Sequence, residues 1–160
     1  RLHPFISTSP PFSLTTPKRL FPVMLNPDRI RAKLQDISGS LERLDRFRTM
    51  SREAFLADED AQDIARSRLL TAIEAALNIC FHLSAKKLAK VPEGYAECFL
   101  TLGKAGLVEP SLAKRLGTMA GFRNRLVHVY WDVDYGQVYD IIINDLKDLE
   151  FFCREVAELL

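Results

Sequence analysis

The amino-acid sequence predicts an all-α protein, folded as an antiparallel bundle of about five helices. The first observation behind this prediction is the length of 160 residues, which suits one domain of ordinary size. The second is that only Pro27, Pro92 and Pro110 occur from Met24 onward and that the seven glycines are thinly spread, so turns are few. The third is that apolar residues recur at steps of three and four, which is the spacing of one helix face.

Two long helices are expected first. Asn26 and Pro27 suit the N-cap and the first position of a helix of about five to six turns. The buried face expected for this helix consists of Ile30, Leu34, Ile37, Leu41, Leu44 and Phe47. The longest helix is expected over residues 60–88, with a basic end that suits the negative pole of the helix dipole. The buried residues expected for it are Ile64, Ile73, Leu77, Cys80 and Phe81.

Three further helices complete the predicted bundle. One spans about Tyr95 to Gly103, and the next begins at Pro110 and ends near His128, where β-branched residues weaken a helix. The apolar stripe of this fourth helix is Leu112, Leu116, Met119, Phe122 and Leu126. Asp134, with Gln137 three residues later, forms a start that resembles a capping box. From there we expect one last helix to run to the C-terminus.

Residues 1–23 differ from the rest of the chain. They hold five of the eight prolines and six Ser or Thr residues, and no helical or strand period fits them. We therefore predict that this Pro/Ser-rich head is disordered in isolation. We interpret it as added or mis-assigned upstream sequence before a start at Met24, so the helical domain is expected to span residues 24–160.

The charge balance excludes a uniformly basic surface for nucleic acid. The chain has 22 basic and 21 acidic residues, a net charge of +1. Three of the basic residues, Arg1, Lys18 and Arg19, lie in the acid-free head, and without them 19 basic residues stand against 21 acidic ones, a net charge of −2. A local basic patch stays compatible with this balance.

The sequence also indicates a protein of the reducing cytoplasm. No apolar run approaches the roughly 18 residues that a membrane-spanning helix needs. The three cysteines, Cys80, Cys98 and Cys153, are widely separated and lack C-x-x-C spacing. We interpret them as small apolar residues rather than as disulfide partners or zinc ligands, and we expect no metal site.

The densest concentration of polar chemistry lies in the segment GFRNRLVHVYWDVD, residues 121–134. Arg123, Asn124, His128 and Tyr130 supply a fixed cation, an amide, an imidazole and a phenol. On an ideal helix Arg123 and His128 would point about 140° apart, because they are five residues apart. The helix must therefore loosen before His128 if both side chains are to reach one site.

This motif resembles the HEPN superfamily. The spacing R-N-x-x-x-H-x-Y over residues 123–130 is similar to that of the HepT-like toxins of MNT-HEPN toxin–antitoxin pairs. The resemblance continues through the segments PEGYAECFLTLGKAGLV, LAKRLGTMAGFRNRLVHVYWDVD and VYDIIINDLKDLEFF. It covers the chain from about Leu25 to the C-terminus and leaves the Pro/Ser-rich head outside.

The resemblance implies a small helical domain that pairs with a second copy and sets two Arg/His motifs into one cleft across a two-fold axis. It further implies an endoribonuclease that uses neither metal nor cofactor. His128 is then the general acid or base, and Arg123 binds the phosphate and stabilises the charge of the transition state. Asn124 orients the phosphate, and attack by the 2′-hydroxyl leaves a 2′,3′-cyclic phosphate and a 5′-hydroxyl.

The resemblance also implies a partner and a means of control. The toxin of a type VII-like pair is silenced by a cognate minimal nucleotidyltransferase, an MntA-like antitoxin, which transfers AMP to a tyrosine. Tyr130 matches that tyrosine. Tyr135 and Tyr139 lie close in sequence and are alternative acceptors.

Several of these residues also have plain structural interpretations. Arg123 and His128 could cap the fourth helix or pair with acids such as Asp132, and Tyr130 and Trp131 could be interface aromatics. The acids Asp58, Glu59, Asp60 and Asp63 suit a helix N-terminus better than a cation site.

Two residues in the middle of the longest predicted helix, and one alternative function, also need interpretation. Glu74, isolated in the apolar stretch TAIEAALNIC, is predicted to be a buried polar residue that faces the cleft, and it is kept as a secondary site candidate. His82 is interpreted as structural or partly exposed. The alternative function is a non-catalytic subunit that docks nucleotide or substrate for a minimal nucleotidyltransferase.

Overall fold

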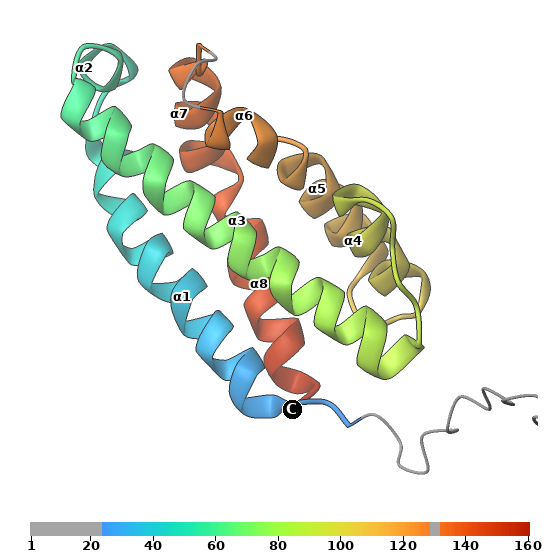
Figure 1. Cartoon of the computed structure of the whole chain (residues 1–160). Coiled ribbons are helices and arrows are strands. Elements are labelled where there is room, and N and C mark those ends of the chain that lie inside the picture. Colours follow the sequence, from blue (N-terminus) through green and yellow to red (C-terminus); the bar gives the residue numbers. More distant parts are fainter. Residues whose placement is uncertain (1–23, 129–131) are drawn as a thin grey trace, which may run out of the picture.

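The described part of the chain is entirely helical in its regular elements. The computed structural model describes residues 24–128 and 132–160 (Figure 1). The Pro/Ser-rich head, Tyr130 and Trp131 lie outside these described residues. The helices, in chain order, are α1 (Pro27–Asp45), the 3₁₀ helix η1 (Arg46–Thr49), α2 (Arg52–Leu56), α3 (Glu59–Leu88), α4 (Tyr95–Lys104), α5 (Pro110–Ala120), α6 (Arg123–Val127), α7 (Tyr135–Asn144) and α8 (Leu146–Glu158). The prediction of an all-α bundle is confirmed.

The long antiparallel pair α1 and α3 forms one side of the bundle (Figure 1). The hairpin of α4 and α5 packs on α3, and α8 lies against α1 and α5. Apolar side chains from these helices meet in one core, and burial of each large side chain contributes about 1.5–3 kcal/mol. The largest fully buried residues are Phe47, Phe55, Phe152, Ile30, Ile37, Leu44, Leu69, Ile79, Leu83, Leu102, Leu116 and Leu126.

The helix starts agree with the sequence. The side chain of Asn26 accepts a hydrogen bond from the backbone N–H of Arg29, and Pro27 begins α1. Asp58 caps α3 in the same way, so the acidic run 58–60 lies at a helix N-terminus as expected. Asp134 accepts from the backbone N–H of Gln137 and begins α7.

Two expected helices are each divided. The predicted fourth helix ends at Ala120, and α6 begins at Arg123 after Gly121 and Phe122, because this break lets Phe122 and Leu126 reach the core. Glycine, which disfavours helix, stands at the break. The predicted last helix is broken at Asp145, where residues of low helix propensity, Asn144 and Asp145, follow three isoleucines.

Other expectations for individual elements were incomplete. Helix α2 and the 3₁₀ helix were not predicted, since each is too short to show a period. Ile64 is 37% exposed rather than buried, because it lies near the N-terminal end of α3 on its outer edge. Phe81 is half-buried, whereas Ile73, Leu77 and Cys80 are buried as expected.

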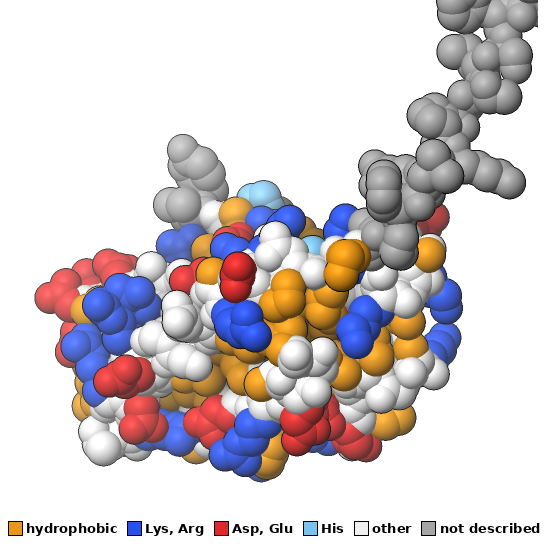
Figure 2. Space-filling model, turned by 90° about the horizontal axis from the view of Figure 1, so that it is seen from below, with side chains coloured by type: hydrophobic (Ala, Val, Ile, Leu, Met, Phe, Trp, Pro, Cys, Tyr) orange, Lys and Arg blue, Asp and Glu red, His pale blue; other side chains and the backbone are white. Residues whose placement is uncertain are grey.

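The surface agrees with the charge balance. On the face shown in Figure 2, basic and acidic side chains are interspersed around a patch of hydrophobic ones, so this face is not uniformly basic. None of the described helices is both long and apolar enough to cross a membrane.

His82 has the structural role that the sequence suggested. It is buried, and its Nε2 accepts the backbone N–H of Asn26 at 3.1 Å, which ties the start of α1 to α3. Burial lowers the pKa of His82, and the positive charges of Arg29 and Lys86 lower it further. The neutral ring is required, because a protonated Nε2 would be a donor facing a donor.

This arrangement predicts a loss of stability in acid. Because the pKa of His82 in the folded protein lies below its ordinary value of 6.5, the unfolded chain binds the proton more readily. The contribution of this group to the free energy of unfolding is therefore complete above pH 6.5 and is lost as the pH falls through the folded pKa. Denaturant titrations at pH 7.5 and pH 5 give the loss of unfolding free energy between these two pH values. This loss should be smaller in His82→Gln than in the parent, by about 1 kcal/mol. Equal losses in the parent and in His82→Gln would contradict the prediction.

Candidate active site

The short helix α6 presents the polar motif. It has five residues, Arg123–Val127, and its single fully buried side chain is that of Leu126. Asn124 and Arg125 are exposed. His128 is exposed and ends α6 with extended backbone angles, φ −80° and ψ 100°. The expected loosening of the helix before His128 is therefore confirmed.

Arg123 is held between α3 and α4. Its Nε and Nη2 donate to Oε1 of Glu74 at 3.3 Å and 3.1 Å, and its guanidinium lies 5.6 Å from the ring centre of Tyr95. Its Nη1 donates to Oδ1 of Asn124 at 3.3 Å. A guanidinium has five N–H groups, so these bonds leave one N–H on each terminal nitrogen. Two such groups in one plane can bind a phosphate or carboxylate in bidentate fashion.

The structure brings Glu74 to the motif but corrects its burial. The side chain is 47% exposed, not buried as predicted, because it pairs with Arg123 of α6 at the surface of α3 rather than facing the core. Arg123 pairs with Glu74 rather than with Asp132, which is exposed. Sequence reasoning missed Tyr95, an aromatic partner that lies two helices before the motif in the chain, at the start of α4.

Arg66, a second residue of α3, was also missed. Its Nε donates to the backbone carbonyl of Leu126 at 2.7 Å, near the end of α6. Such a carbonyl has no partner within a helix that ends one residue later, so Arg66 satisfies it. Arg66 and Glu74 are about two turns apart along α3. They therefore fix the two ends of α6 on one long helix.

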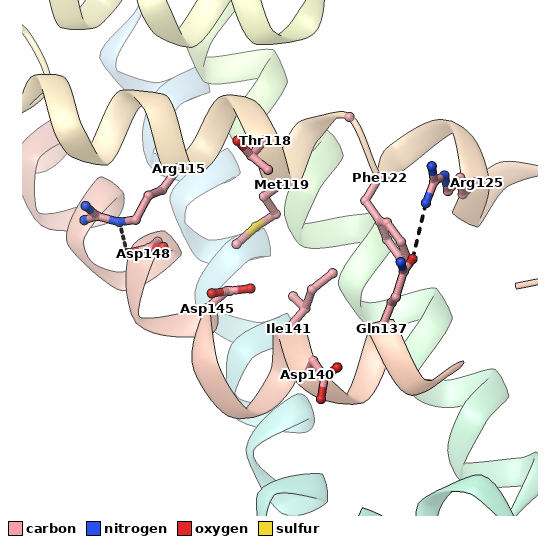
Figure 3. Close-up of a pocket in the computed structure, with 11 residues that line it drawn as sticks. Arg115, Thr118, Met119, Phe122, Arg125, Gln137, Asp140, Ile141, Asp145 and Asp148 are labelled. Atoms are coloured by element: carbon pink, nitrogen blue, oxygen red, sulfur yellow. Dashed lines mark hydrogen bonds and ion pairs between the residues drawn. The ribbon is translucent and has the colours of Figure 1, made fainter. Parts of the chain in front are cut away.

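The other side of α6 faces a cavity between α5–α6 and α7–α8 (Figure 3). Nη1 of Arg125 donates to Oε1 of Gln137 at 3.3 Å, and Nε of Arg115 donates to Oδ1 of Asp148 at 3.1 Å. These two contacts join the two helix pairs at the two ends of the cavity.

The described tyrosines near the motif differ in their surroundings. The hydroxyl of Tyr139 donates to the carbonyl of Met50 at 2.7 Å, and its ring packs against Phe55. Tyr135 is half-buried at the start of α7. The predicted acceptor, Tyr130, lies outside the described residues. Within the described ranges, no three His, Cys, Asp or Glu side chains are grouped so that they could hold a metal ion.

The fold and the site together define a helical protein with an Arg/His motif on a short helix after a glycine break. Residues 37–156 match the family model described as ribonuclease HepT-like, and the chain belongs to this family. It is 31% identical over 136 residues to the tRNA nuclease HepT of Aphanizomenon flos-aquae, with 85% of this chain and 92% of the relative covered. It is 28% identical over 98 residues to the mRNA nuclease HepT of Shewanella oneidensis, with 61% and 74% covered.

Solved structures with the same fold include members of toxin–antitoxin complexes. One is the tri-AMPylated HEPN toxin of Shewanella oneidensis in complex with MNT antitoxin, with a TM-score of 0.74, 24% identity, and 82% of this chain and 98% of that chain covered. A second is a toxin–antitoxin structure with AMP-PNP, with a TM-score of 0.75, 24% identity and the same coverage. A cytosolic protein of unknown function from Bacillus subtilis has a TM-score of 0.67 at 18% identity, with 81% and 90% covered.

The Arg66 contact predicts a local change in helix opening. Arg66→Gln removes the donor that reaches the Leu126 carbonyl, so α6 should open more often. The loss of one hydrogen bond, about 1 kcal/mol, corresponds to roughly five-fold faster amide exchange in α6. Hydrogen exchange followed by mass spectrometry measures this. Arg68→Gln is the matched control, since Arg68 points to another side of α3, and unchanged exchange in Arg66→Gln would show that the contact does not hold α6.

Proposed function

We propose that this protein is a HepT-like toxin, an endoribonuclease whose active site is built on α6 and the residue after it. The observation that carries the proposal is family membership, together with Arg123 held by Glu74, since its hydrogen bonds to described residues leave two N–H groups for a phosphate. The two curated relatives are nucleases, one named for tRNA and the other for mRNA. RNA is the proposed substrate class, and the cytoplasm is the proposed location.

The proposed reaction is an in-line transfer at phosphorus. A histidine base removes the proton of the ribose 2′-hydroxyl, and the 2′-oxygen forms a bond to phosphorus. The bond from phosphorus to the 5′-oxygen breaks, and a histidine acid protonates that leaving oxygen. The products are a 2′,3′-cyclic phosphate and a 5′-hydroxyl. Arg123 stabilises the added negative charge, and in this proposal the side-chain amide of Asn124 donates to the same phosphate and orients it.

A two-fold homodimer is the second part of the proposal. The proposed step needs a base and an acid at the same time, and a single His128 cannot be both. Two facing motifs in a dimer supply one histidine for each role. Sedimentation at micromolar concentration should therefore give twice the chain mass. A strict monomer with full activity would contradict this part of the proposal and leave the nuclease assignment in place.

The first test of the nuclease is substitution of His128. His128→Ala should slow RNA cleavage by roughly 10²- to 10⁴-fold, because a positioned general acid or base contributes about that factor. Arg123→Lys keeps the charge but loses the planar pair of donors and should also slow cleavage. The measurement is cleavage of RNA by purified protein in excess chelator, which also tests the metal-independent mechanism.

The control for these variants is Arg154→Lys, an exposed arginine on α8. It should cut as fast as the parent, and all variants should keep the helical circular dichroism spectrum. If His128→Ala cuts at the parent rate, the nuclease proposal is wrong. Nucleotide binding without cleavage by the parent would instead favour the docking subunit.

Silencing by the cognate nucleotidyltransferase is proposed to act on Tyr130. The S. oneidensis toxin that shares this fold is tri-AMPylated, and Tyr130 matches the modified position of the family motif. The attached AMP brings a permanent negative charge and an adenosine into a site for an RNA phosphate, so it repels and blocks the substrate. The hydroxyl of Tyr139 already donates to Met50, which makes this residue a less suitable acceptor.

Tyr130→Phe removes the acceptor oxygen and should leave cleavage largely intact while it prevents silencing. Incubation with the partner enzyme, ATP and Mg²⁺, followed by intact-mass analysis and peptide mapping, measures the modification. Tyr135→Phe is the matched control and should still be modified. AMP on the Tyr130→Phe protein would move the acceptor to another tyrosine.

A further inference from the structure

The cavity beside α6 has the size of a ligand site. It measures about 600 Å³, within the range of small-molecule sites, roughly 300–1,000 Å³. Gly121, Phe122 and Arg125 line it directly, so it borders the motif itself (Figure 3). We refer to it as the α6 cavity.

The α6 cavity combines apolar walls with a few polar groups. The apolar surface is formed by Met119 of α5, by Phe122 between α5 and α6, and by Ile141 of α7. The polar groups that line the cavity are Arg125 with its partner Gln137, Arg115 with its partner Asp148, and Thr118, Asp140 and Asp145. A flat aromatic ring with polar edges fits such a lining, because its faces need apolar contact and its edge needs hydrogen bonds.

Asp145 is a further polar residue that lines the cavity. It lies at the break between α7 and α8, and Figure 3 shows its carboxylate directed toward the side chain of Met119. Asp148 is paired with Arg115 and Asp140 with Arg52, whereas no described side chain donates to the carboxylate of Asp145. Burial raises the pKa of Asp145, and the negative charges of Asp148 and Asp140 add to this rise, whereas the positive charges of Lys147 and Arg115 act against it. A hydrogen-bond donor in the cavity would stabilise this carboxylate.

Arg123 and the α6 cavity lie on two sides of one helix. Arg123 and Arg125 are two residues apart, about 200° around the helix axis, and their partners are on α3 and α7 respectively. A helix with its side chains is about 10–12 Å across. Neighbouring nucleotides of an unpaired RNA strand can bridge that separation, with the phosphate at Arg123 and a base in the cavity.

We infer that the α6 cavity binds the base of a nucleotide next to the scissile phosphate and prefers a base with an exocyclic amino group over uracil. This inference rests on the proposed function, since it takes the cut strand to be the source of the base. The amino groups of cytosine, adenine and guanine can donate to the carboxylate of Asp145. Uracil offers carbonyl oxygens on both sides of its single N–H, and an ionised carboxylate repels them.

The test measures base preference beside the cut. After the cut is mapped in a short unstructured RNA, each flanking nucleotide is varied through the four bases and kcat/KM is measured for each RNA. When uracil occupies one of the flanking positions, the kcat/KM of the parent protein should be roughly ten-fold lower than with the other three bases at that position. In Asp145→Asn, the amide can donate to a uracil oxygen, so the four RNAs should differ by about two-fold or less.

Two further variants complete the experiment. Glu158→Gln removes an equal charge from an exposed site on α8 and should keep the parent preference. Thr118→Trp places an indole at the cavity wall and should raise KM for all four RNAs while kcat changes little. A changed oligomeric state in Thr118→Trp, with the base preference intact, would mean that a second copy covers the cavity and that the inference is wrong.

The remaining outcomes separate the inference from the proposed function. Cleavage by the parent without base preference, or a preference that persists in Asp145→Asn, would overturn the base site and leave the nuclease intact. If the parent cuts none of the RNAs, the proposed nuclease is wrong, and the affinities of the same RNAs then decide about the cavity. Weaker binding of the uracil-containing RNA, lost in Asp145→Asn, would support the base site, and equal affinities would overturn it.

Discussion

The contact between α3 and α6 is the constraint on which the site depends. A helix of five residues has almost no stability by itself, because the cost of its first turn exceeds the gain from its few hydrogen bonds. Helix α6 persists because Leu126 is buried, because Arg66 binds the Leu126 carbonyl, and because Glu74 binds Arg123. A 30-residue helix therefore serves as the rigid support for a five-residue one.

The pair of Glu74 and Arg123 contributes orientation more than stability. Both side chains are partly exposed, and ion pairs of this kind contribute about 0–1 kcal/mol to folding. An unpaired arginine samples many rotamers, however, and each bound phosphate would have to select one of them. Glu74 and the ring of Tyr95 fix that rotamer in advance. The partial exposure of Glu74 also matters, because a fully buried partner would hold the guanidinium too far from a ligand in solvent.

The features that the sequence reveals are those decided by neighbours in the chain. Asn26, Asp58 and Asp134 each cap a helix through a bond to the residue three positions later, so the starts are readable. The roles of Arg66 and Tyr95 cannot be predicted in this way, because Arg66 binds a backbone carbonyl 60 residues away and Tyr95 contacts a guanidinium in another helix. Glu74 was found because a lone acid in an apolar stretch is conspicuous, but its exposure depends on how α6 crosses α3.

The two helix breaks that local periodicity missed are the features that shape the α6 cavity. Gly121 and Phe122 separate α5 from α6, Asp145 separates α7 from α8, and all three residues line the cavity. Continuous helices would have satisfied the periodic apolar pattern equally well. The tertiary contacts between Arg115 and Asp148 and between Arg125 and Gln137 hold the broken pairs against each other. The same departure from regular helix therefore turns Arg123 toward α3 and opens a cavity beside it, which explains how the proposed phosphate site and the proposed base site can share so short a segment.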